Sequence, residues 1–145
     1  MSYWDTSALS KLYFPEPDSA AFAQKAANNL TIVTIRLALY EMRRVAFRKE
    51  SDGLILAGTA ESVLTQMNQD IGAGQIRVVE TDARVEAEFN LIMASCYRHA
   101  PPLPVRTLDA LHLAASRTSG QTEVVATDKR MRDAAKLLGF SVFPA

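Results

Sequence analysis

Four acidic residues stand where chemistry could use them, and two of them occupy equivalent places in the chain. Asp5 follows the short apolar run SYW, and Asp128 follows the run VVAT; a helical pattern begins after each. Loops at the carboxyl ends of parallel strands build the ligand sites of open sheets. An aspartate before a helix is also an ordinary N-cap, which would explain either residue alone. The two together, after strands that could be neighbours, favour a shared site.

Asp109 lies in the segment LDALHLAAS, which is apolar nearly all round and is therefore predicted to be a buried helix. Burial of an unpaired carboxylate costs several kcal/mol. The favourable interaction of the carboxylate with the helix dipole offsets only about 0.3–1 kcal/mol of this cost. The sequence thus predicts a cation or strong hydrogen-bond donors beside Asp109, unless the first turn of its helix reaches solvent.

Glu41 falls at the edge of the apolar stripe of a helix predicted over residues 35–50. A surface pair with Arg44, three residues on, is the simpler interpretation of this residue alone. The apolar stripe of the helix lies on one side of Glu41, and Arg44 and Arg48 lie on the other side. They are either a solvated face or a pair of cations that hold an RNA backbone beside an acidic site.

These four carboxylates, if they meet, predict a divalent metal site, because like charges repel unless a cation lies among them. Ligation by oxygen alone suits Mg²⁺ or Mn²⁺, as one ion or two. Such a site performs phosphodiester hydrolysis, since the metal lowers the pKa of a bound water and neutralises developing charge.

The elements that must position these acids alternate along the chain. Short β-branched runs occur at residues 2–5, 31–35, 75–80, 122–127 and 141–143. Helical patterns separate them: a helix capped by Asp18, helices over 35–50 and 54–70, one through 85–96, one capped by Thr107, and one that ends at Gly139. This alternation predicts an α/β fold in which helices flank a parallel sheet on both sides.

Composition narrows the function classes further. The chain has 145 residues and a net charge of zero, so no bulk positive field attracts nucleic acid, and any binding of a polyanion must be local. Cys96 is the single cysteine, which excludes an internal disulfide and a cysteine-rich zinc site and favours the cytoplasm. His99 and His112 are too few for a histidine-based zinc hydrolase, and His112 is predicted to be a packed residue of its helix. No apolar run is long enough for a membrane span.

Four segments in order, YWDTSALSKLY, LALYEMRR, RTLDALHLAA and VVATDKRMRDAAKLLGF, resemble the PIN-domain ribonucleases, and closely the VapC toxins of bacterial type II toxin–antitoxin pairs. The resemblance implies a single PIN domain over residues 1–145, built as a three-layer α/β/α sandwich with a central parallel sheet of four or five strands. It also implies metal-site roles for four acids and supporting roles for two hydroxyls: Asp5, Glu41, Asp109 and Asp128, with Ser7 and Thr127.

The same resemblance implies Mg²⁺- or Mn²⁺-dependent cleavage of RNA, a homodimer, and inhibition by a cognate antitoxin chain. A non-catalytic PIN module that binds RNA or a protein partner is an alternative, as is a housekeeping structure-specific nuclease. A phosphotransfer enzyme on a similar sheet is a weaker alternative, because Ser7 stands where a haloacid-dehalogenase-type phosphatase needs its second aspartate.

Overall fold

The computed structural model describes all 145 residues and contains five strands and seven helices. In chain order they are β1 (Ser2–Trp4), α1 (Thr6–Tyr13), α2 (Ser19–Ala27), β2 (Ile32–Ile35), α3 (Arg36–Ser51), α4 (Thr59–Gly72), β3 (Ile76–Val79), α5 (Ala83–Arg98), α6 (Thr107–Thr118), β4 (Glu123–Val125), α7 (Lys129–Leu137) and β5 (Ser141–Phe143). The predicted alternation is therefore confirmed. None of these helices combines the length and the hydropathy that a bilayer crossing requires.

The strands form one all-parallel sheet in the order β3-β2-β1-β4-β5. The central strand β1 pairs Tyr3 with Val33 of β2 and with Val124 of β4. The pairing continues one residue beyond β1, because the backbone N–H of Asp5 donates to the carbonyl oxygen of Val125 at 3.1 Å. The sheet topology thus fixes Asp5 next to the end of β4, three residues before Asp128.

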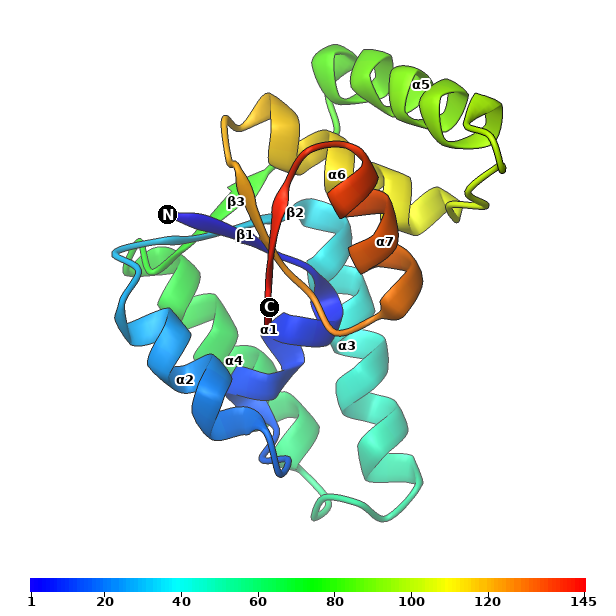
Figure 1. The fold of residues 1–145 in the computed structure, drawn as a ribbon. Helices are drawn as coiled ribbons and strands as arrows, with labels where there is room; N and C mark the ends of the chain where they lie inside the picture. The colour runs from blue at the N-terminus through cyan, green and yellow to red at the C-terminus, as the bar shows by residue number, and fades with distance from the viewer.

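Helices cover both faces of the sheet, as Figure 1 shows, and two hydrophobic clusters lie between the layers. Side chains alternate across a strand, so the consecutive residues Tyr3 and Trp4 are buried on opposite faces. Tyr3 belongs to the cluster under α5, α6 and α7, and Trp4 to the cluster under α1, α2, α3 and α4. The predicted three-layer α/β/α sandwich is confirmed, with five strands in its sheet.

Two local predictions were wrong, and a third holds for the residue's position but not for its hydrogen bond. The helix predicted from Leu54 begins at Thr59, because Gly58 has a φ of +86°, which a right-handed helix excludes; Leu54 and Leu56 are 69% and 83% exposed. Thr107 is the first residue of α6 rather than its cap, and the residue before it makes no capping hydrogen bond with its side chain. Asp18 does occupy the N-cap position of α2, but its carboxylate is drawn to Lys11 at 2.8 Å instead.

Candidate active site

Asp5 is the N-cap of α1 and is only 6% exposed. Its Oδ1 accepts two hydrogen bonds, from the backbone N–H of Ala8 at 2.9 Å and from the hydroxyl of Ser7 at 2.6 Å. Its Oδ2 takes no hydrogen bond. Burial raises the pKa of Asp5 above its ordinary value, against the opposing influence of His112 and of the Ser7 hydrogen bond. The capping role is therefore confirmed, and one carboxylate oxygen remains free for a ligand.

Glu41 lies in the second turn of α3, where its Oε1 accepts two hydrogen bonds from other elements. The hydroxyl of Thr6 donates at 2.7 Å and Nε2 of His112 at 2.8 Å. Burial, the largest single influence, raises the pKa of Glu41, but the hydrogen bonds from His112 and Thr6 and the nearby positive charge of Arg106 together hold it below its usual value. The simpler interpretation, a surface pair with Arg44, is wrong, because Glu41 faces the site.

Asp109 and Asp128 are held by one guanidinium group. Arg106 donates to Asp109 through Nε at 2.8 Å and Nη2 at 3.3 Å, and its Nη2 lies 3.3 Å from Oδ1 of Asp128. Asp109 is 7% exposed, so the prediction that this buried carboxylate needs a cation is confirmed. Asp128 also caps α7 by accepting from the backbone N–H of Met131 at 3.1 Å.

The four acids lie at the same end of the sheet in two groups, Glu41 near Asp5 and Asp109 with Asp128 around Arg106. Glu41 raises the pKa of Asp5, and the charge of Arg106 acts on Glu41 as well as on Asp109 and Asp128. In the present side-chain arrangement no group of three or more acidic, histidine or cysteine side chains is set to ligate a metal. The reason is visible in the contacts, since Asp109 and Asp128 turn to Arg106 while Glu41 turns to His112.

The chemistry of this donor set nevertheless fits a divalent cation. All candidate ligands are carboxylate oxygens, which Mg²⁺ and Mn²⁺ prefer. The region already attracts a positive charge, because the Arg106 side chain lies there although it is 52% exposed and has solvent available to it. A cation that binds the four acids must displace or share that guanidinium.

Ser7 and Thr127 lie beside Asp5, though they act through different groups. The hydroxyl of Ser7 donates to Asp5 and accepts the backbone N–H of Thr127 at 3.0 Å. The hydroxyl of Thr127 makes no hydrogen bond and is exposed. Ser7 therefore joins the loop after β4 to the first turn of α1, and the contribution of Thr127 to that link is its backbone.

Arg44 and Arg48 follow Glu41 at i+3 and i+7 in α3, so they lie along the same face of the helix toward its C-terminus. Arg44 is exposed and makes no ion pair, whereas Arg48 lies 3.7 Å from Asp52. With Lys49 they line a shallow cavity of about 230 Å³. Glu41 and Arg48 are seven residues apart, which is about 10 Å along a helix axis. The cavity thus lies within about two helical turns of Glu41 along α3.

Sequence reasoning missed three residues of the site. Arg106 stands three residues before Asp109, a helical spacing that pairs unlike charges and could have indicated the contact. Thr6 and Tyr3 carry no comparable pattern, because their partners Glu41 and His112 come from distant parts of the chain. His112 was predicted to be a packed residue; it is 3% exposed, as predicted, and it also hydrogen-bonds to Glu41.

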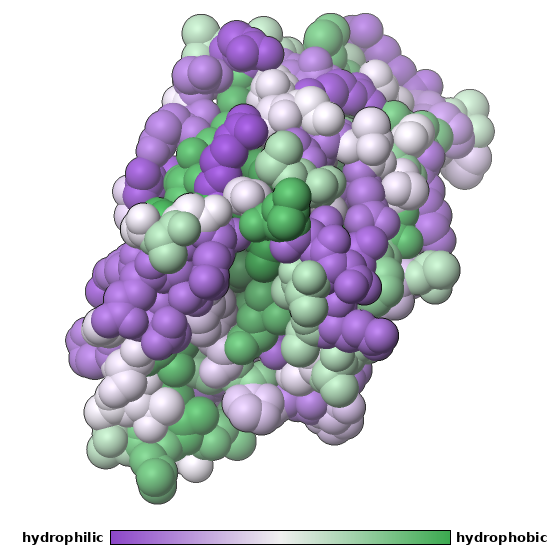
Figure 2. All heavy atoms as spheres, turned by 90° about the vertical axis from the view of Figure 1, so that its left-hand side faces the viewer, coloured by the Kyte–Doolittle hydropathy of each residue, from purple (hydrophilic) through white to green (hydrophobic).

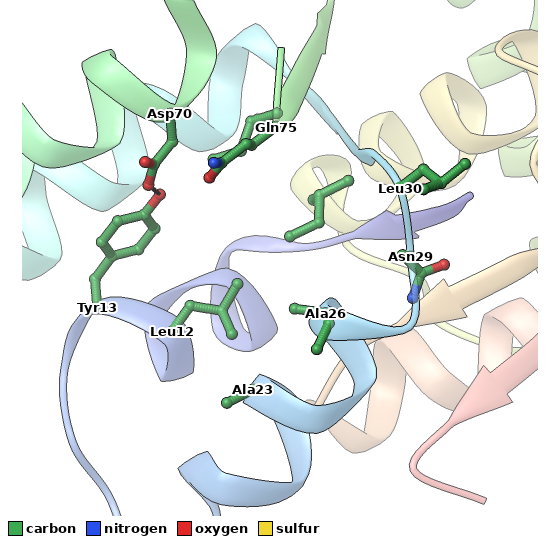
Figure 3. Close-up of a pocket in the computed structure, with 11 residues that line it drawn as sticks. Leu12, Tyr13, Ala23, Ala26, Asn29, Leu30, Asp70 and Gln75 are labelled. Carbon is green, nitrogen blue, oxygen red and sulfur yellow. Dashed lines mark hydrogen bonds between the residues drawn. The ribbon is translucent and has the colours of Figure 1, made fainter. Parts of the chain in front are cut away.

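A larger cavity, of about 570 Å³, lies away from the acids (Figure 3). It includes Ile32 and Ile76, which begin β2 and β3, so it sits at the opposite end of the sheet from Asp5. Its ionisable groups, Tyr13 and Asp70, hydrogen-bond to each other. Figure 2 views the left-hand side of Figure 1 and shows apolar atoms gathered in a strip there between hydrophilic regions. The cavity is an apolar groove without catalytic groups.

Comparison with known proteins adds three findings. The PIN domain family model matches residues 2–137. Ribonuclease VapC35 of Mycobacterium tuberculosis is 30% identical over 148 residues, which cover 98% of this chain and 95% of the relative. Two solved structures share the fold. FitAcB from Neisseria gonorrhoeae has a TM-score of 0.72 and 20% identity, and the match covers 99% of this chain and 96% of that one. M. tuberculosis VapC20, a sarcin–ricin loop cleaving toxin, has a TM-score of 0.69 and 18% identity, and the match covers 92% of this chain and 95% of that one. Structures of FitAB and of VapBC complexes bound to DNA are also similar.

Proposed function

This chain belongs to the PIN domain family of VapC ribonucleases, and we propose from that premise that it is the RNA-cleaving toxin of a toxin–antitoxin pair and depends on Mg²⁺ or Mn²⁺. The proposal includes the assignment of Asp5, Glu41, Asp109 and Asp128 as the metal-binding and catalytic acids. Residues 1–145 act in it as one PIN domain, since both hydrophobic clusters share the one sheet.

The observation that carries the proposal is the charge pattern at the carboxyl end of β1. Asp5 is buried with one carboxylate oxygen that takes no hydrogen bond, and at the same end of the sheet Asp109 and Asp128 share the guanidinium of Arg106. Clustered acids that already collect a cation are a suitable place for a stronger one. A divalent ion bound there supplies charge to stabilise a phosphodiester under attack and a water of lowered pKa.

The chain's own residues have distinct tasks in this proposal. Asp5 and Asp128 are fixed by the helix N-termini they cap, so their free oxygens have a defined direction. Thr6 and His112 hold one oxygen of Glu41 and leave the other available. Ser7 supports Asp5, and the main chain at Thr127 keeps the two strand ends together.

Arg44 and Arg48 are proposed to hold the substrate rather than to take part in bond breaking. Both are exposed and lie along α3 from Glu41. Guanidinium groups bind phosphate oxygens and position a nucleic acid without reading its sequence. They would keep the scissile phosphodiester near the acids.

Two protein partners belong to the proposal, a cognate antitoxin chain and a second copy of this chain in a homodimer. Support comes from the likeness to FitAB and VapBC structures and from large apolar side chains that remain exposed, among them Leu54, Leu56 and Leu91 at 62–83%. Contiguous apolar surface marks contacts with another chain, and Leu54 and Leu56 stand two residues apart in the segment between α3 and α4.

The decisive experiment compares purified wild type with Asp5→Asn on total cellular RNA, with Mg²⁺, with Mn²⁺, or with a chelator. Asparagine caps a helix as well as aspartate does, so the substitution removes charge and keeps the start of α1. We expect cleavage by wild type with either metal, none with the chelator and none by the variant.

Asp133→Asn is the matched control, because it removes a carboxylate that pairs with Lys129 on the surface of α7. It should cleave like wild type. Equal activity of Asp5→Asn and wild type would reject the assigned site, and cleavage that persists in the chelator would reject the metal.

A further inference from the structure

A chain of hydrogen bonds runs from the sheet to the candidate site through three elements. The hydroxyl of Tyr3 in β1 lies 2.7 Å from Nδ1 of His112 in α6, and Nε2 of that ring lies 2.8 Å from Oε1 of Glu41 in α3. Tyr3 and His112 are 0% and 3% exposed. Their rings also pack edge to face, with centroids 5.8 Å apart and an interplanar angle of 72°.

The chemistry of the two end groups fixes the proton positions between them. A carboxylate only accepts hydrogen bonds, so Nε2 of His112, 2.8 Å from Oε1 of Glu41, is the donor of this contact. A phenol has one O–H to donate, and the buried hydroxyl of Tyr3 lies 2.7 Å from Nδ1 of His112. In a neutral imidazole that carries its proton on Nε2, Nδ1 accepts, and the Tyr3 hydroxyl is the donor it faces.

We propose that Tyr3 is a positioning residue, which holds His112 in the Nε2–H tautomer so that the ring donates to Oε1 of Glu41 and leaves Oε2 directed to the cation. The metal part of this inference rests on the proposed function; the tautomer part does not. Ligating carboxylates are commonly oriented by such outer partners, whose loss costs about 10–100-fold in metal affinity.

A buried tyrosine–histidine pair could equally serve packing alone, and the position of Glu41 argues against that. Its side chain is 26% exposed, so the chain of bonds begins in the core and ends at the rim of the site. Glu41 could satisfy Oε1 with water or with Thr6 alone, yet the ring is aligned to it from another helix. If the rings of Tyr3 and His112 served packing alone, neither ring nitrogen would need to face a hydrogen-bonding partner.

The first measurement reads the tautomer directly. In ¹⁵N-labelled protein with chelator, long-range ¹H–¹⁵N spectra distinguish a protonated ring nitrogen from an unprotonated one, and His112→Gln identifies the His112 signals by their loss. We expect the Nε2–H form in wild type and a mixture of both tautomers in Tyr3→Phe, which removes one oxygen and keeps the ring. Tyr13→Phe is the matched control, because it removes a hydroxyl that bonds Asp70 far from His112.

The second measurement is calorimetric titration of the same proteins with Mn²⁺ alone. We expect binding about tenfold weaker in Tyr3→Phe and about 10–100-fold weaker in His112→Ala, with no change in Tyr13→Phe. His112→Gln offers Glu41 an amide donor that needs no tautomer. The His112→Gln variant should therefore bind Mn²⁺ nearly as tightly as wild type. Adding Tyr3→Phe to it should not change the Mn²⁺ affinity further.

The outcomes separate this inference from the proposed function. If the Nε2–H form is still the single form in Tyr3→Phe, the positioning role is overturned and the metal site stands. The same conclusion follows if Glu41→Gln weakens Mn²⁺ binding while Tyr3→Phe and His112→Ala leave it unchanged. Mn²⁺ binding indifferent to Glu41→Gln removes Glu41 from the metal site and overturns the metal part of this inference, whereas the spectra alone decide the tautomer part. Circular dichroism of each variant shows that the fold is retained.

Discussion

The backbone N–H of Thr127 donates a hydrogen bond of 3.0 Å to the hydroxyl oxygen of Ser7, across 120 residues of sequence. The same hydroxyl donates to Asp5 at 2.6 Å. Ser7 thereby ties the loop that carries Asp128 to the turn that carries Asp5. Because both acids follow adjacent strands, this side chain adds a second link between strand ends that the backbone bond from Asp5 to Val125 already joins.

Ser7→Ala is expected to weaken both the fold and the site. The change removes two hydrogen bonds, and a typical one contributes about 0.5–1.5 kcal/mol to stability. We expect the free energy of unfolding to fall by about 1 kcal/mol in urea titrations and Mn²⁺ affinity to fall as well. Ser10→Ala is the control, because its hydroxyl bonds the carbonyl of Ser7 on the same helix without touching an acid. An effect of equal size in both variants on Mn²⁺ affinity would contradict the specific role of Ser7.

Asp5→Asn is expected to stabilise the metal-free protein at neutral pH. The native pKa of Asp5 is raised, so the folded state holds this proton more tightly than the unfolded state. The resulting stabilisation is complete below the ordinary pKa of 3.8 and is lost as pH rises through the native pKa. Asparagine cannot ionise, so the variant should melt a few degrees above wild type at pH 7.

Thermal melts in chelator from pH 3 to pH 8 check this. The difference between the two melting temperatures should shrink toward zero as the pH falls below 3.8. A variant less stable than wild type at pH 7 would show that the buried charge of Asp5 is compensated within the metal-free protein.

Arg106→Ala is expected to destabilise the metal-free protein and to tighten metal binding. Removal of the guanidinium leaves the buried carboxylate of Asp109 without its partner, a loss of about 1–3 kcal/mol. It also frees Asp109 and Asp128 for a cation, so Mn²⁺ should bind several-fold more tightly and restore the melting temperature.

Arg117→Ala is the control for that experiment, since it removes another arginine–carboxylate pair, with Glu88 at 2.9 Å, far from the acids. Its Mn²⁺ affinity should equal that of wild type. If Arg106→Ala leaves the affinity unchanged or weakens it, then the guanidinium does not compete for the position of the metal.

Arg44→Ala is expected to weaken RNA binding and cleavage while the fold keeps its stability. Arg44 is exposed and unpaired, and substitutions at such positions change stability by about 0.5 kcal/mol or less. Binding of RNA, measured at several salt concentrations, should show a log–log slope reduced by about 0.7 for the lost phosphate contact. Arg77→Ala, exposed on the edge strand β3, should leave the slope as it is.

Local sequence patterns were sufficient for the elements and for part of the site. The β-branched runs and helical spacings predicted five strands and the helices between them, and burial of Asp109 predicted its cation. They were insufficient where one residue overrides a pattern. Gly58, in the left-handed region, delays α4 past Leu54 and Leu56, and those side chains are left in solvent.

The sequence by itself determined that four carboxylates stand at strand ends and on helix edges, because strand and helix periods decide which way each residue faces. Only the tertiary structure decided what those carboxylates touch. Glu41 is bound to His112 and Thr6 rather than to Arg44, and Arg106 joins Asp109 to Asp128. Such contacts bring together residues as many as 71 positions apart through the packing of helices on a shared sheet, and no local pattern contains that information.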